Sequence, residues 1–406
     1  MANVSSSNGL EKRPKLRFPG FDEPWNTALL SDYFVKSTKK NSDGMISNVI
    51  CNSAKQGLIP QREYFDKDIV NSDNTNGYYI IESNDFVYNP RKSADAPYGP
   101  ISSYQYPEAG IVSPLYLCFR AKREINPLYF EWYFRSSTWH RYIYMSGDSG
   151  ARHDRVSIKD DVFFAMPINV PSAKEQERIS LFLDAIERRI ETQRTLVETL
   201  KKYKRGLLNK LFSNINSNIY PTVYLSEVAD FLQGLTYSPS DVSVSGYLVL
   251  RSSNIQNGML SFDDCVYVDK KVDESLQVKC DDVIMCVRNG SKNLVGKTAL
   301  IPPNMPMTTW GAFMMIIRSK LNDTYIFHYL NSQMFFSQVF KDTGTATINQ
   351  ITKGILNECR LPLPPETERK QISKMLSSFD AKIQNAEKCL ATLVNLKKAL
   401  LQQLFI

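Results

Sequence analysis

Apolar residues recur in alternating steps of three and four along two segments, residues 172–212 and 365–406. This spacing, sustained for about four heptads, keeps one apolar stripe facing a partner and is typical of a coiled-coil helix. The predicted seam residues are Ile179, Leu183, Ile186, Ile190, Val197, Leu200, Leu207, Leu211, Ile372, Leu376, Phe379, Ile383, Leu390, Leu393, Leu400 and Leu404. Each helix would be about 60 Å long and overhang a single domain. We therefore expect the two stripes to pack against each other rather than each on its own domain.

The two helical segments are copies of one another at a shift of 193 residues. Matches include Ile179 with Ile372, Leu183 with Leu376, Lys204 with Lys397, and Phe212 with Phe405. The repeat extends upstream, where Asn126, Tyr129 and Tyr133 match Asn322, Tyr325 and Tyr329. The chain is thus predicted to be two tandem copies of a module of about 190 residues.

These boundaries predict a polar tail (1–20), a first globular module (21–171), its helix (172–212), a second globular module (213–364) and its helix (365–406). Because a whole module separates the helices, a compact chain predicts that they run antiparallel, as a pseudo-twofold dumbbell. Gln193 interrupts the first seam where the second has Ala386. It is either a register device or an exposed edge position.

The globular modules show strand patterns between turn signals, so the fold class is α+β, two mixed modules joined by the long helices. In the second module we predict strands at 247–251, 265–268, 283–287, 297–301 and 308–317, then a helix over 324–340. The first module has a matching helix over 126–139. Polar, glycine-containing loops follow at 146–155 and 342–349.

Composition excludes several classes of protein. Of 406 residues, 43% are hydrophobic, which argues against wholesale disorder. No apolar run reaches the ~18 residues of a membrane span, and the N-terminus lacks a signal peptide's apolar stretch, so we expect a cytoplasmic protein with no membrane partner. Seven cysteines without a C-x-x-C pair, and three scattered histidines, predict no metal site.

The net charge of +7 lies entirely in the two helical segments. Residues 172–212 carry ten basic and six acidic side chains, and residues 365–406 carry seven and four. The two globular modules are nearly balanced, so bulk charge alone is weak evidence for an anionic partner.

Two segments resemble catalytic motifs, and neither matches its motif fully. Residues 290–298 resemble a phosphate-binding P-loop, but the first glycine lies one residue too far from the second glycine. The two prolines that follow also preclude the helix whose N-terminus would bind phosphate. Residues 126–129 resemble an adenine methyltransferase tetrapeptide without its second proline. We therefore predict that the chain is not an enzyme and has no catalytic residue.

The duplicated helix, each copy preceded by prolines, carries a family resemblance. The segments are Pro171-Ser-Ala-Lys-Glu-Gln-Glu-Arg-Ile179, Lys204-Arg-Gly-Leu-Leu-Asn-Lys-Leu-Phe212, Pro364-Pro-Glu-Thr-Glu-Arg-Lys-Gln-Ile372 and Lys398-Ala-Leu-Leu-Gln-Gln-Leu-Phe405. With the opening Pro14-Lys-Leu-Arg-Phe-Pro-Gly-Phe21, the whole chain resembles the specificity (S) subunit of a type I restriction-modification system. Arg369, where the first copy has Gln176, is a mild departure.

The resemblance implies two target-recognition domains that each read half of a bipartite site in double-stranded DNA, with the paired helices fixing the spacing. It implies two methyltransferase (M) subunits that use S-adenosylmethionine to methylate adenine, and restriction (R) subunits that use ATP and magnesium. No cofactor is expected on this chain. Since the modules share little sequence outside the scaffold, the target is expected to be asymmetric.

Base contacts are expected from polar and basic loop residues, because arginine pairs with guanine and asparagine with adenine in the major groove. The candidates are Asn89, Arg91, Lys92, Arg152, His153, Arg155, Arg251, Asn254, Arg288, Asn289, Lys292, Lys297 and Thr345. Each is alternatively a surface residue or a buried hydrogen-bonding group. Lysines of the helices, such as Lys201 and Lys204, either contact phosphates or belong to a solvated or partner-binding face.

Two other classes of function remain as alternatives. A coiled-coil dumbbell scaffold that joins two protein partners without reading DNA would lack salt-dependent DNA affinity. A self-sufficient nuclease-methyltransferase would need cofactor and metal motifs that the sequence does not contain.

Overall fold

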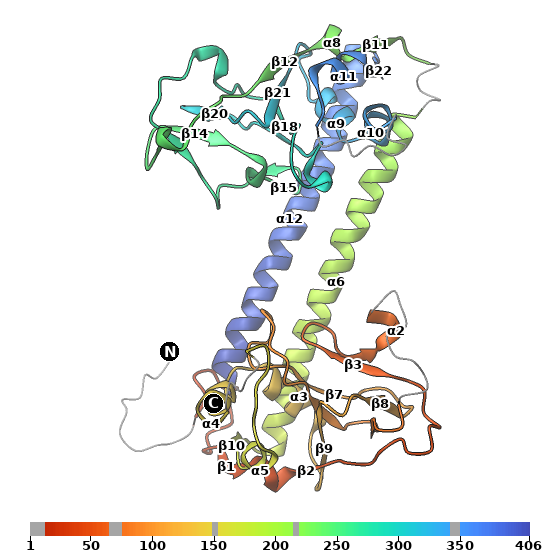
Figure 1. The fold of residues 1–406 in the computed structure, drawn as a ribbon, viewed down its shortest axis with the longest axis vertical. Coiled ribbons are helices and arrows are strands. Elements are labelled where there is room, and N and C mark those ends of the chain that lie inside the picture. Colours follow the sequence, from red (N-terminus) through yellow and green to blue (C-terminus); the bar gives the residue numbers. More distant parts are fainter. Residues whose placement is uncertain (1–12, 65–74, 148–152, 214–218, 342–349) are drawn as a thin grey trace. The chain divides into compact units, whose positions relative to one another are not determined.

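The computed structural model describes residues 13–64, 75–147, 153–213, 219–341 and 350–406. The contacts divide the chain into two compact units. Unit 1 comprises residues 1–193 with 389–406, and unit 2 comprises residues 194–388. The boundaries fall within the two long helices, α6 (Ala173–Leu211) and α12 (Glu366–Leu404), so each unit holds a mixed α/β part and a stretch of both helices (Figure 1).

Unit 1 is built around a four-stranded antiparallel sheet in the order β2-β9-β6-β7, with two-stranded ladders β1-β10, β3-β4 and β5-β8. Its strands are β1 (Asn26–Leu29), β2 (Phe34–Lys36), β3 (Ile50–Ser53), β4 (Gly57–Pro60), β5 (Tyr79–Ile81), β6 (Phe86–Tyr88), β7 (Ile101–Ser103), β8 (Gly110–Val112), β9 (Leu117–Ala121) and β10 (Pro167–Val170). Its short helices are α1 (Leu30–Tyr33), α2 (Gln61–Tyr64), α3 (Pro127–Arg135), α4 (His140–Ser146) and α5 (Asp160–Phe164).

Unit 2 has a four-stranded antiparallel sheet in the order β12-β21-β18-β19, a second sheet β13-β17-β14-β20, and ladders β11-β22 and β15-β16. Its strands are β11 (Thr222–Tyr224), β12 (Ala229–Gln233), β13 (Val242–Ser243), β14 (Tyr247–Leu250), β15 (Ile255–Gln256), β16 (Met259–Leu260), β17 (Tyr267–Val268), β18 (Val283–Cys286), β19 (Thr298–Leu300), β20 (Thr308–Trp310), β21 (Met314–Ser319) and β22 (Arg360–Pro362). Its helices are α8 (Leu225–Val228), α9 (Tyr325–Leu330), α10 (Gln333–Val339) and α11 (Lys353–Glu358), with 3-10 turns η2 (Pro239–Asp241), η3 (Ser252–Asn254), η4 (Glu274–Leu276) and η5 (Lys292–Leu294).

The central sheets of the two units share one topology, as the sequence repeat predicted. The chain order of the strands in β2-β9-β6-β7 equals that in β12-β21-β18-β19, and both sheets are antiparallel. The short helix before each sheet is held alike, since the backbone N–H of Leu30 donates to Met166 and that of Leu225 donates to Cys359. The α+β fold class is therefore confirmed.

Each long helix ends in an aromatic core. In unit 1 the ring of Phe405 lies 5.6 Å from that of Tyr129 and 6.1 Å from that of Tyr133. In unit 2 the ring of Phe212 lies 5.2 Å from that of Tyr325 and within 5.8 Å of that of Tyr329. These are the tyrosines and phenylalanines that the repeat aligned, so the matched residues form the same contact twice.

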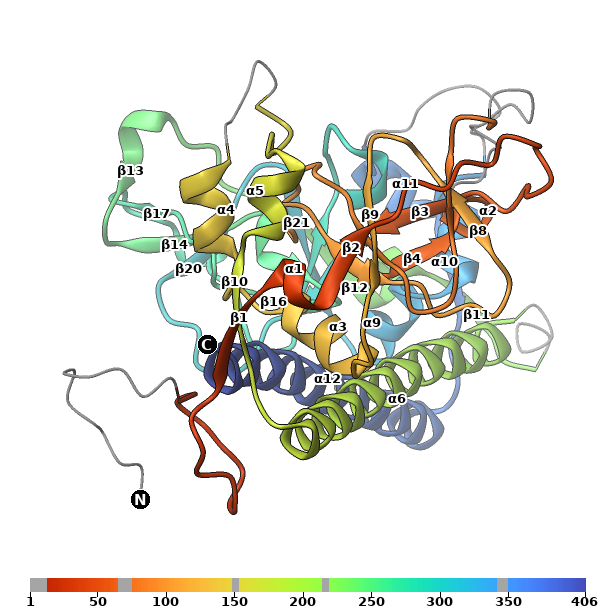
Figure 2. The same ribbon diagram turned by 90° about the horizontal axis from the view of Figure 1, so that it is seen from below.

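The stretches of α6 and α12 within each unit lie side by side and run in opposite directions (Figure 1, Figure 2). In unit 2, Lys201 pairs with Glu387 at 2.8 Å and Lys204 with Asp380. Since the partner number falls as the lysine number rises, the helices are antiparallel. In unit 1, Lys397 pairs with Glu187 at 2.6 Å.

The seam residues predicted for both helices are all buried or half-buried. Gln193 is buried as well, with 6% of its surface exposed, and Ala386 with 7%. The expectation that Gln193 sits at an exposed edge is therefore wrong. Tyr203, which also fits the spacing, is 62% exposed although its ring lies 5.4 Å from that of Phe379.

Three predicted elements differ in the structure. The helix expected over 324–340 is α9 and α10, because the Ser332 hydroxyl accepts from the N–H of Phe335 and caps a new helix. The helix expected over 126–139 is the shorter α3, which ends at Arg135, and the separate helix α4 begins at His140. The strand expected over 308–317 is β20 and β21, which belong to different sheets.

Membrane-spanning helices and clusters of metal ligands are absent from the described residues. None of the helices there is long and apolar enough to cross a membrane. Within the same residues, no cluster of three or more histidine, cysteine, aspartate or glutamate side chains could hold a metal ion.

Candidate nucleic-acid interface

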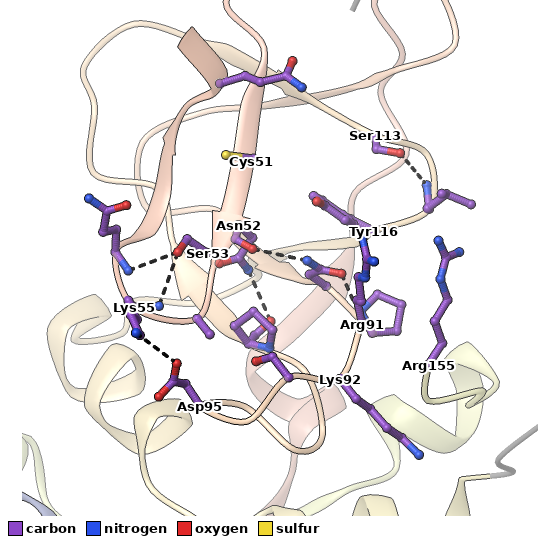
Figure 3. Close-up of a pocket in the computed structure, with 18 residues that line it drawn as sticks. Cys51, Asn52, Ser53, Lys55, Arg91, Lys92, Asp95, Ser113, Tyr116 and Arg155 are labelled. Atoms are coloured by element: carbon purple, nitrogen blue, oxygen red, sulfur yellow. Dashed lines mark hydrogen bonds and ion pairs between the residues drawn. The ribbon is translucent and has the colours of Figure 1, made fainter. Parts of the chain in front are cut away.

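Four of the predicted DNA-contacting residues lie around one cavity of unit 1. The cavity has a volume of about 1020 Å³ and is lined by the strand β3, the turn after it, and the segment that follows β6 (Figure 3). Asn89, Arg91, Lys92 and Arg155 all contribute to its wall. The fold thus brings together candidates that are more than sixty positions apart in the chain.

Arg91 and Arg155 face each other across a single antiparallel bridge. The flanking hydrogen bonds run from the N–H of Lys92 to Asp154, at 2.8 Å, and from the N–H of Val156 to Pro90, at 2.9 Å. In this pattern the backbones of the two opposed residues are not hydrogen-bonded to each other, and their side chains project from the same face of the ladder. Figure 3 shows both side chains extending in the same direction.

Neither of these guanidinium groups forms an ion pair with a carboxylate of the described residues. The Nε–H of Arg155 is buried and has no hydrogen-bond acceptor there. The acidic residue on the cavity wall, Asp95, lies 3.5 Å from Lys55 instead. Burial raises the pKa of the neighbouring Tyr116 hydroxyl, and the positive charge of Arg91 offsets a small part of this rise. The two arginines of the cavity therefore carry positive charges that no carboxylate of the described residues neutralises.

The other candidates of unit 1 have different surroundings. Asn89 is bound to its own loop, because its amide donates to Asn52 at 3.2 Å and its side-chain oxygen accepts from the N–H of Arg91. Lys92 is half-buried and His153 is exposed. Arg152 lies outside the described residues.

In unit 2, Arg288 is the exposed counterpart of Arg91. It follows β18 as Arg91 follows β6, and it forms an isolated antiparallel bridge with Gln350. The N–H of Ile351 donates to Val287 at 2.7 Å, matching the bond between Val156 and Pro90. The guanidinium carbon of Arg288 lies 5.3 Å from the ring centroid of Phe313, whose side chain is 58% exposed.

Two asparagines of unit 2 are engaged in local structure. Asn254 is fully buried, and its amide donates to the carbonyls of Ser261 and Asp264, both at 3.0 Å. This geometry makes it a loop anchor rather than a reading residue. Asn289 donates to the Ser252 hydroxyl at 3.2 Å and accepts from the N–H of Ser291.

The remaining candidates of unit 2 are dispersed. Arg251 is half-buried and pairs with Asp264 at 2.8 Å. Lys297 lines a second cavity of about 400 Å³ together with Asn293, Asn331 and Phe336. Thr345 and the side chain of Lys292 lie outside the described residues. The P-loop interpretation fails, as expected, because residues 298–300 form the strand β19.

A duplicated ion pair between a buried aspartate and a partly exposed arginine was not predicted from the sequence. Asp85 receives two hydrogen bonds from Arg120, at 2.6 and 2.7 Å, immediately before β6. Asp282 receives two from Arg318, at 2.8 and 2.7 Å, immediately before β18. The signal was a shift of 197 to 198 residues, which also relates Arg91 to Arg288 and was masked by unlike neighbouring residues.

Several known proteins are similar to this chain in sequence or in fold. The family model of the type I restriction modification DNA specificity domain matches residues 220–394. The EcoKI specificity subunit of Escherichia coli K12 is 28% identical over 171 residues, covering 40% of this chain and 36% of the relative. The StySPI specificity subunit of Salmonella potsdam is 28% identical over 176 residues, covering 41% and 38%. The chain thus spans less than two-fifths of the length of either relative.

A solved structure from a study of complex assembly and conformational transition of the type I R-M system has the same fold. It matches with a TM-score of 0.60 at 17% identity, over 96% of this chain and 99% of that chain. The resemblance to the specificity subunits of type I restriction-modification systems, predicted from the duplicated helix motif, is thereby confirmed.

Proposed function

We propose that this chain is the DNA-reading specificity subunit of a type I restriction-modification system and recognises a bipartite, asymmetric target. The observation that carries the proposal is the duplication of one sheet and one aromatic helix contact in two units whose exposed loops differ. A duplicated scaffold supports two reading heads. Different residues at equivalent loop positions, such as Arg155 and Gln350, support two unlike half-sites.

In this proposal residues 21–171 and 213–364 are the two target-recognition domains, and the helices 172–212 and 365–406 form the antiparallel spacer of a pseudo-twofold dumbbell. A helix of about 60 Å limits the half-sites to a separation below about 18 base pairs at ~3.4 Å per pair. The helices would act as the ruler for the target.

The chain would contribute no catalysis. Two methyltransferase subunits would methylate adenine in each half-site with S-adenosylmethionine, and restriction subunits would supply the steps that need ATP and magnesium. The paired lysines of the helices, including Lys204 and Lys397, are engaged with carboxylates of the opposite helix, which favours a structural role over phosphate contact.

The proposal is tested by purifying the chain with its candidate methyltransferase subunits and mapping methylated adenines across a genome. We expect one bipartite motif with unlike halves, and we expect deletion of either module to remove its half. Absence of a bipartite motif, or a motif that survives either deletion, would contradict the proposal. A protein-joining scaffold that does not read DNA would instead lack salt-dependent DNA affinity.

A further inference from the structure

Arg91 in unit 1 and Arg288 in unit 2 occupy the same structural position. Each follows by a few residues the strand that comes second along the chain in its four-stranded sheet, β6 or β18. Each comes after a buried aspartate that pairs with an arginine, and each forms an isolated antiparallel bridge to a segment from later in the chain. The residue across the bridge is Arg155 in unit 1 and Gln350 in unit 2.

These two arginines differ from Arg120 and Arg318 of the same sheets, which are each neutralised by a buried aspartate. Arg91 and Arg288 are exposed, and neither forms an ion pair with a carboxylate in the described parts of the chain. Two uncompensated arginines side by side, as in unit 1, repel one another unless an external acceptor lies between them.

The shape of the site favours a flat acceptor with two oxygen or nitrogen atoms. Arg288 is 5.3 Å from the Phe313 ring centroid, and contact with an aromatic ring orients the plane of the guanidinium. An oriented planar fork matches the O6 and N7 atoms of guanine, whereas glutamine matches the N6 and N7 atoms of adenine. The same fork also matches the oxygens of a phosphate, so the experiment below separates base contact from phosphate contact.

We propose that the bridge pairs Arg91 with Arg155 and Arg288 with Gln350 are the base-reading pairs of the two units, with the arginine common to both contacting guanine. The residue opposite it sets the second base, which is guanine for Arg155 and adenine for Gln350. This inference rests on the proposed function and assigns the difference between the half-sites to one position in each unit.

The test exchanges the variable member of each pair. The chain is assembled with its methyltransferase subunits, and methylation is read by sequencing from a duplex library randomised in both half-sites. Arg155→Gln should change the preference at one position of one half-site from guanine to adenine by about tenfold or more, and leave the other half-site unchanged. Gln350→Arg should produce the reverse change in the other half-site.

Control variants separate base reading from loss of charge or fold. Arg123→Ala removes an exposed arginine of unit 1 that stacks on Tyr33 and does not line the cavity, and its base preferences should equal those of wild type. Gln350→Arg changes an exposed residue, so it tests the proposal even if Arg155→Gln fails to fold.

Failure of the base-reading inference and failure of the proposed function give different results. If Arg155→Gln weakens methylation equally for every sequence and flattens the salt dependence, while Gln350→Arg strengthens it equally and steepens that dependence, the arginines contact phosphates and this inference is overturned. If the wild-type complex selects no bipartite sequence, the proposed function fails before the variants are compared.

Discussion

The ring of Phe405 packs against the ring of Tyr129 with their centroids 5.6 Å apart, although one residue belongs to the second copy of the repeat and the other to the first. The equivalent rings of Phe212 and Tyr325 are 5.2 Å apart in unit 2. Each long helix therefore ends in the aromatic core of the module that it does not directly follow. This exchange gives both helices a hydrophobic anchor at their C-terminal ends.

Phe405→Ala should destabilise unit 1 by about 3 kcal/mol, because it removes a buried ring from contact with Tyr129 and Tyr133. The measurement is the free energy of unfolding from denaturant titration. Leu396→Ala, which shortens an exposed side chain of the same helix, is the matched control and should cost less than about 0.5 kcal/mol. Equal losses in the two variants would show that Phe405 is not an anchor.

The interhelix pairs of Lys397 with Glu187 and of Lys204 with Asp380 are related by the 193-residue shift of the repeat. Both side chains of the first pair are largely buried, so a double-mutant cycle of Lys397→Ala and Glu187→Ala should give a coupling energy of about 0.5 to 1 kcal/mol. The more exposed pair of Lys39 and Glu82, 3.6 Å apart, should give less. A coupling near zero for Lys397 and Glu187 would contradict a role in helix pairing.

His328 predicts a loss of stability in mild acid. Its imidazole is fully buried beside Ser377 and Thr324, with Asp380 4.0 Å from Nδ1, and burial followed by the charge of Lys204 lowers its pKa to about 3. The unfolded chain takes up the proton near pH 6.5 and the folded chain only near pH 3, so stability is full above pH 6.5 and falls below it. Between pH 7 and pH 5 the loss from this group is about 2 kcal/mol.

The corresponding measurement compares the free energy of unfolding of wild type and His328→Gln at both pH values. The substitution is expected to make the pH dependence shallower by about that amount, whatever it does to stability at pH 7. His153→Gln, at an exposed histidine, is the control for loss of an imidazole. A pH dependence unchanged by His328→Gln would show that the buried histidine is not responsible.

The long helices and the repeat could be predicted from sequence because both are periodic. A heptad pattern over about forty residues specifies α6 and α12 almost to the residue, and identical residues at one shift reveal the duplication. The breaks within the shorter helices could not be predicted with the same ease. They depend on single side chains such as Ser332, whose hydroxyl starts a new helix inside an otherwise helical apolar pattern.

Candidate contact residues could be predicted only as residue types. Asn254 and Arg288 both look like polar loop residues in the sequence, yet the first is fully buried in its own loop and the second is exposed. Which polar side chain anchors a loop depends on carbonyl groups that the fold brings together. Gln350 was not among the candidates because its importance comes from the bridge to Arg288.

The central claim, that the paired helices set the distance between two reading modules, is tested most directly by the spacer length of the recognised target. Deleting one heptad from each helix, residues 190–196 and 383–389, keeps the pairs of Glu187 with Lys397 and of Lys204 with Asp380 and removes Glu387, the partner of Lys201. The helices would shorten by about 10 Å, the rise of about three base pairs. We predict that the complex with methyltransferase subunits then methylates targets with a spacer about three base pairs shorter, or none. Methylation of targets with the original spacer would contradict the account.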